Sequence, residues 1–122
     1  MTEYVNLEEA AAICAFHGWT VRDYGLLDSA LARPRTSLYG QEMFPGVHLK
    51  GAALIDSINR HHPLIDGNKR LSWLAVAFFY RKNGLDIVAE LDDAEKYVLA
   101  IAGEVPRLRI EDSAVWLAEH SS

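Results

Sequence analysis

Residues 62–70 read HPLIDGNKR, and residues 71–82 continue as LSWLAVAFFYRK. The first stretch combines a histidine, a carboxylate, a glycine, an amide and two adjacent cations. The second is apolar on every side over residues 74–79, which is typical of a helix surrounded by other helices. We therefore expect a polar loop that enters the N-terminus of the central helix of an all-α fold. Because the free N–H groups of a helix N-terminus attract anions, this junction predicts a phosphate-binding site.

The composition favours one compact domain over residues 1–122. The chain is 50% hydrophobic, its formal net charge is -5 and its pI is about 5.4. Such an acidic chain lacks the basic footprint of nucleic-acid-binding proteins, so we expect no direct nucleic-acid partner. Its longest apolar stretch, residues 73–80, is far shorter than the roughly 20 residues that cross a bilayer. We therefore expect a protein that does not associate with membranes.

Cys14 is the only cysteine in the chain, which excludes an intramolecular disulfide and a cysteine-based zinc site. It lies in the apolar run 10–16, and we predict that it is a small buried hydrophobe rather than a nucleophile. The first four residues include the acidic Glu3 and no basic residue, and we expect no signal segment after them. These features predict a cytoplasmic protein.

Capping signals and apolar spacing predict about six helices. Asn6 and Glu9 resemble a capping box that begins a helix ending near Phe16. Asp23 is placed to cap a second helix that stops before Pro34. The other helices are expected over residues 47–60, 68–82, 92–104 and 111–120. Residues 35–46 are the least regular segment, which predicts a loop or small hairpin and a candidate flap over a site.

Lys69 and Arg70 would stand in the first turn of the helix over residues 68–82. That turn is electropositive, so each cation there costs about 0.3–1 kcal/mol, and acidic residues would be more stable. Arg60, His61 and His62 extend the basic cluster upstream. A phosphate ligand would relieve the conflict, because it suits both free N–H groups and an arginine fork. The alternative is that the two cations only face solvent or pair with surface carboxylates.

His62 and Asp66 are the candidate catalytic residues. A histidine side chain can take a proton from a hydroxyl near neutral pH, which makes His62 the candidate general base. Pro63 is expected to hold it in an extended backbone conformation. Asp66 could hold Mg²⁺ beside a nucleotide, or it could cap the helix or the turn before it. The alternative for His62 is a structural histidine that hydrogen-bonds the loop.

Two further residues shape the same loop. Gly67 can adopt backbone conformations closed to other residues, which would turn its N–H toward a ligand, although a plain turn glycine also fits. Asn68 fits a helix cap or a brace for the loop better than a direct ligand contact. The chain contains neither a P-loop nor a dinucleotide-binding glycine motif, and no histidine spacing typical of zinc.

Residues 62–70 resemble the signature of the Fic/Doc family. The Fic branch has the pattern HPFx[DE]GNGR, whereas in the Doc (death-on-curing) branch a lysine replaces the last glycine, as Lys69 does here. Residues 25–34 and 79–84 resemble the same branch, so the resemblance covers most of the chain. It implies a compact Fic/Doc-like helical bundle. Leu64 stands where phenylalanine is usual, which changes the packing of the loop rather than its chemistry.

The resemblance also implies an activity. Doc proteins are toxins of toxin–antitoxin pairs that transfer phosphate from Mg·ATP to a threonine hydroxyl, with elongation factor Tu as the implied target, and so arrest translation. On this resemblance His62 is the base, and Asp66 binds Mg²⁺ and orients the base. The residues implied to hold the nucleotide phosphates are Arg60, Gly67, Asn68, Lys69 and Arg70.

A Phd-like antitoxin is the implied partner, whose C-terminal segment folds into a groove on the toxin. The chain lacks an internal [ST]xxxE[GN] inhibitory motif, which is consistent with restraint by a separate chain. Two alternatives stay open. A Fic-type adenylyltransferase would transfer AMP, although Lys69 crowds the phosphate site where that branch has glycine. An inactive helical binding module would act only through its partner, although the intact His62, Asp66 and Arg70 argue against it.

Overall fold

The computed structural model describes residues 1–103 and 107–122, and most of these residues are helical. The prediction of an all-α bundle of about six helices is confirmed. A short 3-10 turn over Arg33–Arg35 and a two-stranded hairpin of β1 (Ser37–Leu38) and β2 (Gln41–Glu42) connect the second and third helices. The helices of the described residues are α1 (Leu7–His17), α2 (Tyr24–Ala32), α3 (Val47–His61), α4 (Asn68–Lys82), α5 (Leu91–Ala102) and α6 (Ile110–Glu119).

Side-chain caps fix the first two helices where the sequence predicts them. The Asn6 side chain accepts a hydrogen bond from the Glu9 N–H, and the Glu9 carboxylate accepts one from the Asn6 N–H, both at 2.9 Å. Asp23 Oδ1 accepts from the N–H groups of Gly25 and Leu26 at 2.8 and 3.2 Å. Both predicted caps are therefore confirmed, and they fix the residues at which α1 and α2 begin.

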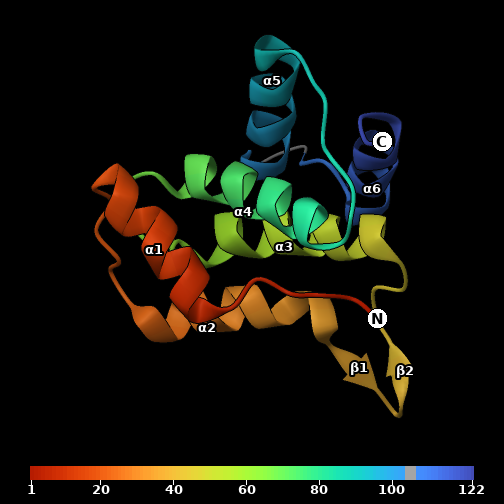
Figure 1. The fold of residues 1–122 in the computed structure, drawn as a ribbon, viewed down its shortest axis with the longest axis horizontal. Helices are drawn as coiled ribbons and strands as arrows, with labels where there is room; N and C mark the ends of the chain where they lie inside the picture. The colour runs from red at the N-terminus through yellow and green to blue at the C-terminus, as the bar shows by residue number, and fades with distance from the viewer. Residues whose placement is uncertain (104–106) are drawn as a thin grey trace.

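Helices α3 and α4 lie side by side at the centre of the molecule, as Figure 1 shows. Helices α1 and α2 cover one side of this pair, and α5 and α6 lie on the other. The central pair supplies many of the fully buried apolar side chains, each at most 1% exposed: Leu54, Ile55, Ile58, Leu71, Val76 and Phe79. Because the loop over residues 62–67 joins the two central helices, both of its ends are held by the core.

Helix α4 is less enclosed than its sequence predicts. Val76 and Phe79 are fully buried, but Trp73, Leu74 and Phe78 are only partly buried. Trp73 and Leu74 border a cleft beneath α5, and Lys82 Nζ lies 5.4 Å from the centroid of the Phe78 ring. The prediction of a helix surrounded on every side is therefore wrong in part, because one face of α4 remains open to a cleft.

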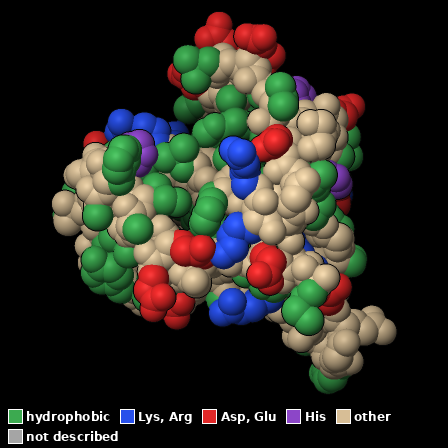
Figure 2. Space-filling model, in the orientation of Figure 1, with side chains coloured by type: hydrophobic (Ala, Val, Ile, Leu, Met, Phe, Trp, Pro, Cys, Tyr) green, Lys and Arg blue, Asp and Glu red, His purple; other side chains and the backbone are tan. Residues whose placement is uncertain are grey.

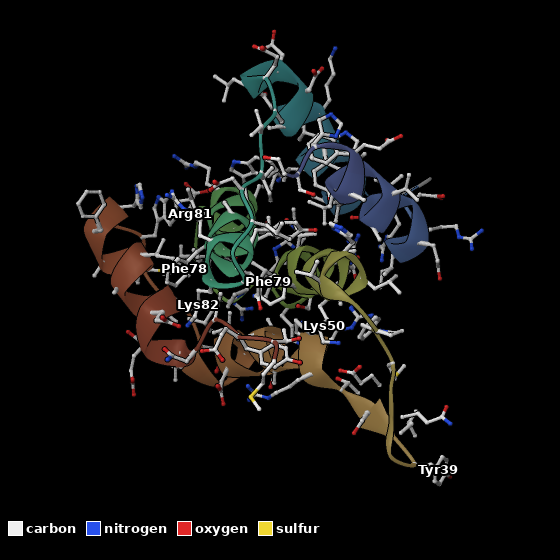
Figure 3. All side chains as sticks on the ribbon, turned by 45° about the vertical axis from the view of Figure 1, so that its right-hand side comes forward. Tyr39, Lys50, Phe78, Phe79, Arg81 and Lys82 are labelled. Carbon is white, nitrogen blue, oxygen red and sulfur yellow. The ribbon has the colours of Figure 1, made fainter. Side chains whose placement is uncertain are left out.

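The hairpin predicted within residues 35–46 is confirmed, but its predicted place over the site is wrong. It lies at the N-terminal end of α3, whereas the polar loop follows the C-terminal end (Figure 1). The 15 residues of α3 separate the two by about 22 Å. The buried Lys50 fixes the hairpin, since its Nζ donates to Glu42 Oε1 at 2.8 Å and to the Phe44 carbonyl at 2.6 Å. The Tyr39 side chain projects at the tip (Figure 3).

Candidate active site

The backbone of His62 differs from the extended conformation that Pro63 predicts. His62 has φ 49° and ψ 58°, in the left-handed region, and its N–H donates to the Ile58 carbonyl at 3.2 Å. Left-handed residues commonly end helices, and a non-glycine residue there costs about 1–3 kcal/mol. The geometry that ends α3 overrides the local preference of a residue before proline. The prediction was therefore wrong, and the loop begins with a sharp reversal at His62.

The connection between α1 and α2 runs beside this loop. Val21 and Leu64 form an antiparallel bridge, and the Ile65 N–H donates to the Thr20 carbonyl at 3.1 Å. Leu64 is 2% exposed, so it anchors the loop in the core. Residues 19–22 therefore form a short segment that is hydrogen-bonded to the loop.

Asn68 and Asp66 each stabilise the backbone of the loop. Asn68 Oδ1 accepts from the Leu64 N–H at 2.9 Å, and its Nδ2 donates to the Leu64 carbonyl at 3.0 Å. The structure thus uses the Asn68 side chain as a brace. Asp66 Oδ1 accepts from the Gly67 N–H at 2.9 Å, so it caps the turn rather than the helix. The Asp66 side chain is exposed to the cleft, where it can take a second ligand.

Gly67 begins α4 with φ 98° and ψ 10°, a conformation that favours glycine. A Cβ atom on it would lie 3.1 Å from ring atoms of Trp19, so a larger residue would be strained and would require the ring to shift. The Trp19 ring stacks on the His17 ring with 4.5 Å between their centroids. The Arg70 guanidinium lies 5.5 Å from the centroid of the Trp19 ring. Sequence reasoning missed Trp19, and its place after the helix-ending Gly18 gave no signal of a role in the site.

A cleft of about 780 Å³ opens over the start of α4, within the usual size range for a small-molecule site. Its polar end is lined by His62, Asp66, Asn68, Lys69 and Arg70. Its apolar wall comes from α4 and α5, with Trp73, Leu74, Leu91, Ala94, Val98, Leu99 and Ala102. In Figure 2, Lys and Arg side chains gather next to a histidine near the end of α1, below the projecting α5. The cleft therefore offers a cationic end and an apolar end.

Lys69 and Arg70 form no ion pair in the described part of the chain, although the carboxylates of Asp66 and Glu95 line the same cleft. Among residues 1–103 and 107–122, no carboxylate lies within ion-pair distance of Lys69 or Arg70. The first turn of α4 carries no acidic residue, and no side chain caps its N–H groups. Exposed cations, free N–H groups and the positive end of the helix dipole therefore coincide, which is the environment that binds phosphate.

The structure does not bring Arg60 together with the other predicted phosphate ligands. Arg60 Nε lies 3.3 Å from Asp56 Oδ1, and its Nη2 donates to the Ile101 carbonyl. Asp56 also binds Arg33 at 2.7 Å. Arg60 therefore links α3 to the end of α5, and we leave it out of the proposed phosphate site.

The side chains of the cleft could bind Mg²⁺ only together with a nucleotide, whose phosphate oxygens would complete the coordination of the ion. Among the described residues, no cluster of three or more His, Cys, Asp or Glu side chains could enclose a metal ion. Mg²⁺ in nucleotide sites usually takes one or two carboxylates, with phosphate oxygens and water as the remaining ligands. The exposed carboxylate of Asp66, on the loop before Lys69 and Arg70, meets that requirement.

Comparison with known proteins places these residues in a family. A family model described as the Fic/DOC family matches residues 2–80. The chain belongs to the Fic/Doc family. "Toxin Doc" of Mycolicibacterium smegmatis is 46% identical over 95 residues, which cover 75% of this chain and 73% of that protein. The Fic/Doc match includes the polar loop and almost all of α4, and it confirms the resemblance seen in residues 62–70.

Proposed function

We propose that this Fic/Doc protein is the toxin of a toxin–antitoxin pair and acts as a Mg·ATP-dependent protein kinase. The observation that carries the proposal is that His62 lines the same cleft as Lys69 and Arg70, which form no ion pair with a carboxylate among the described residues. A base beside an anion site is what transfer of a phosphoryl group to a hydroxyl requires. Similarity to the relative named "Toxin Doc" supports the toxin part of the proposal.

In this mechanism the ATP phosphates lie against the first turn of α4, where Lys69, Arg70 and the free N–H groups hold them. Asp66 would hold Mg²⁺, which would neutralise part of the phosphate charge. His62 takes the proton of a threonine hydroxyl as the threonine oxygen forms a bond to the γ-phosphorus. The bond between that phosphorus and the β–γ bridging oxygen breaks, and ADP leaves. The apolar wall over Trp73 and Leu99 suits the adenine ring.

The family relationship extends the proposal to partners. We propose elongation factor Tu as the protein substrate, with a threonine as acceptor, so that phosphorylation arrests translation in the cytoplasm. A Phd-like antitoxin would restrain the toxin by occupying a groove on its surface. Among the described residues, none of the helices could span a lipid bilayer.

The test is label transfer from ATP to purified elongation factor Tu in the presence of Mg²⁺, with ATP labelled at either the γ- or the α-phosphate. Label from γ-labelled ATP alone, absent with His62→Ala, is the expected result. Label from α-labelled ATP would overturn the kinase proposal in favour of AMP transfer. No label from either, with a factor shown to be active in translation, would overturn the proposed target and support the binding-module alternative.

A further inference from the structure

Arg22 binds the backbone of His62 from outside the catalytic loop. Its Nη2 donates to the His62 carbonyl at 2.6 Å and to the His61 carbonyl at 3.3 Å, and its Nε donates to the His62 carbonyl at 3.1 Å. The Arg22 N–H also donates to the Pro63 carbonyl at 2.7 Å. One residue, 40 positions away in sequence, therefore holds three successive carbonyls at the end of α3.

These carbonyls need an external donor. The last carbonyls of a helix have no intrahelical partner and carry the negative end of the helix dipole, so a guanidinium fork suits them well. The reversal at His62 also needs support, because a residue with a side chain rarely adopts φ near 49°. Such conformations persist where the surroundings over-determine them. Arg22 supplies this support at His62, the candidate general base.

We infer that Arg22 is a positioning residue that holds His62 in the left-handed conformation from which its imidazole borders the cleft. This inference rests on the proposed function of His62. Arg22 does not line the cleft, so its effect passes through the backbone of His62. Lysine at this position keeps the charge but loses the two-nitrogen fork. A positioning role therefore predicts that Arg22→Lys restores only part of what Arg22→Gln loses.

The kinetic test compares Arg22→Gln and Arg22→Lys with the unmodified protein. Misplacement of a reacting group by about 1 Å can cost about 10²-fold, so kcat for phosphate transfer should fall about 10–100-fold in Arg22→Gln and less in Arg22→Lys. KM for Mg·ATP should stay within about twofold, because Lys69 and Arg70 hold the phosphates in both proteins.

Asn6→Ala is the matched control for stability. It removes a helix cap on α1 that does not touch the loop, and should lower Tm by about 5 °C without lowering kcat. A kcat of Arg22→Gln equal to that of Asn6→Ala at a similar Tm would overturn the positioning role.

A second measurement does not depend on catalysis. Hydrogen exchange of the His62 amide, which donates to the Ile58 carbonyl, reports whether the reversal is held. It should become at least about tenfold faster in Arg22→Gln and stay unchanged in Asn6→Ala. Unchanged exchange in Arg22→Gln would overturn the inference. Faster exchange in a protein whose wild type transfers no phosphate would support the hold on the loop while the proposed function fails.

Discussion

The basic residue at the start of α3 and those at the start of α4 are used in opposite ways. Near the N-terminal end of α3, Lys50 is 1% exposed and its ammonium group binds Glu42 and the Phe44 carbonyl. At the N-terminal end of α4, Lys69 and Arg70 are not buried and form no ion pair with a carboxylate among residues 1–103 and 107–122. A paired, buried cation fixes the backbone around it. Unpaired cations in an electropositive helix turn leave a site in which an anion is the missing partner.

Two cations near the C-terminal end of α4 are paired with carboxylates, as Lys50 is. Lys82 Nζ lies 2.7 Å from Glu9 Oε1, and Arg81 Nε lies 3.1 Å from Asp86 Oδ1, both near the C-terminal end of α4 (Figure 3). The two ends of α4 thus repeat the contrast. Cations at its C-terminus complement the helix dipole and are paired, whereas cations at its N-terminus oppose the dipole and are not.

The largest expected effect is on the chemistry of the cleft. His62→Ala should lower the rate of phosphate transfer by about 10²–10⁴-fold, because it removes the general base. Its Tm should change little, since the side chain is exposed. Initial rates and thermal unfolding of the same preparation measure both quantities. If activity and stability were lost together, His62 would be a structural residue like Lys50, and the contrast between the cleft and the start of α3 would not hold.

The next largest effect concerns two neighbouring aromatic residues on α4. Phe79 is 0% exposed and its ring lies 6.2 Å from that of Tyr4, so Phe79→Ala should cost about 3–5 kcal/mol of unfolding free energy. Phe78 is only partly buried, and Phe78→Ala should cost about 1 kcal/mol. Denaturant unfolding of the two variants measures the difference. Equal losses would contradict the open face of α4.

A smaller effect is expected at the start of α3. Lys50→Met keeps most of the volume but leaves the Phe44 carbonyl without its donor, so stability should fall by about 1–3 kcal/mol. Hydrogen exchange should quicken in the hairpin, while Mg·ATP affinity stays unchanged. Weaker Mg·ATP binding in this variant would show that the starts of α3 and α4 are coupled rather than separate.

The smallest effect is a pH dependence at Glu9. Partial burial opposes the charged form of Glu9, but hydrogen bonds from Lys82 and from the Asn6 N–H outweigh it and lower the Glu9 pKa. The folded state then binds the proton less tightly than the unfolded state. The resulting stabilisation is present near neutral pH and is lost as the pH falls below about 5.

Glu9→Gln removes this titration, so its unfolding free energy should fall less steeply with acid than that of the unmodified protein. The difference at neutral pH should be below about 1 kcal/mol, because the pair is partly exposed. Denaturant unfolding at a series of pH values measures it. Parallel curves for the two proteins would show that the paired cation Lys82 adds no charge-dependent stability.

Local signals in the sequence predicted the elements that local chemistry determines. The capping pair Asn6 and Glu9, the cap Asp23 and the brace Asn68 act through hydrogen bonds to residues at most four positions away. Their side chains leave the same signature in any fold. The family signature predicted the polar residues of the cleft, because these residues lie within nine consecutive positions of the sequence.

Long-range contacts account for the rest. Pro63 predicted an extended His62, but the helix end and the guanidinium of Arg22, far away in sequence, impose the opposite conformation. Trp19 shapes the site through contact with Gly67 and Arg70, which no local pattern encodes. Arg60 belongs to the basic cluster by sequence, but Asp56 lies one helical turn before it and forms an ion pair with it outside the cleft.

Mg·ATP affinity of Arg70→Gln, compared with Arg81→Gln by titration calorimetry, tests the central claim most directly. A hydrogen bond to a charged group is worth about 1.5–3 kcal/mol, so Arg70→Gln should weaken binding by about 10–100-fold. Arg81→Gln, which removes a cation already paired with Asp86 at the other end of α4, should bind Mg·ATP like the unmodified protein. Equal affinities for the two variants would contradict a phosphate site at the start of α4.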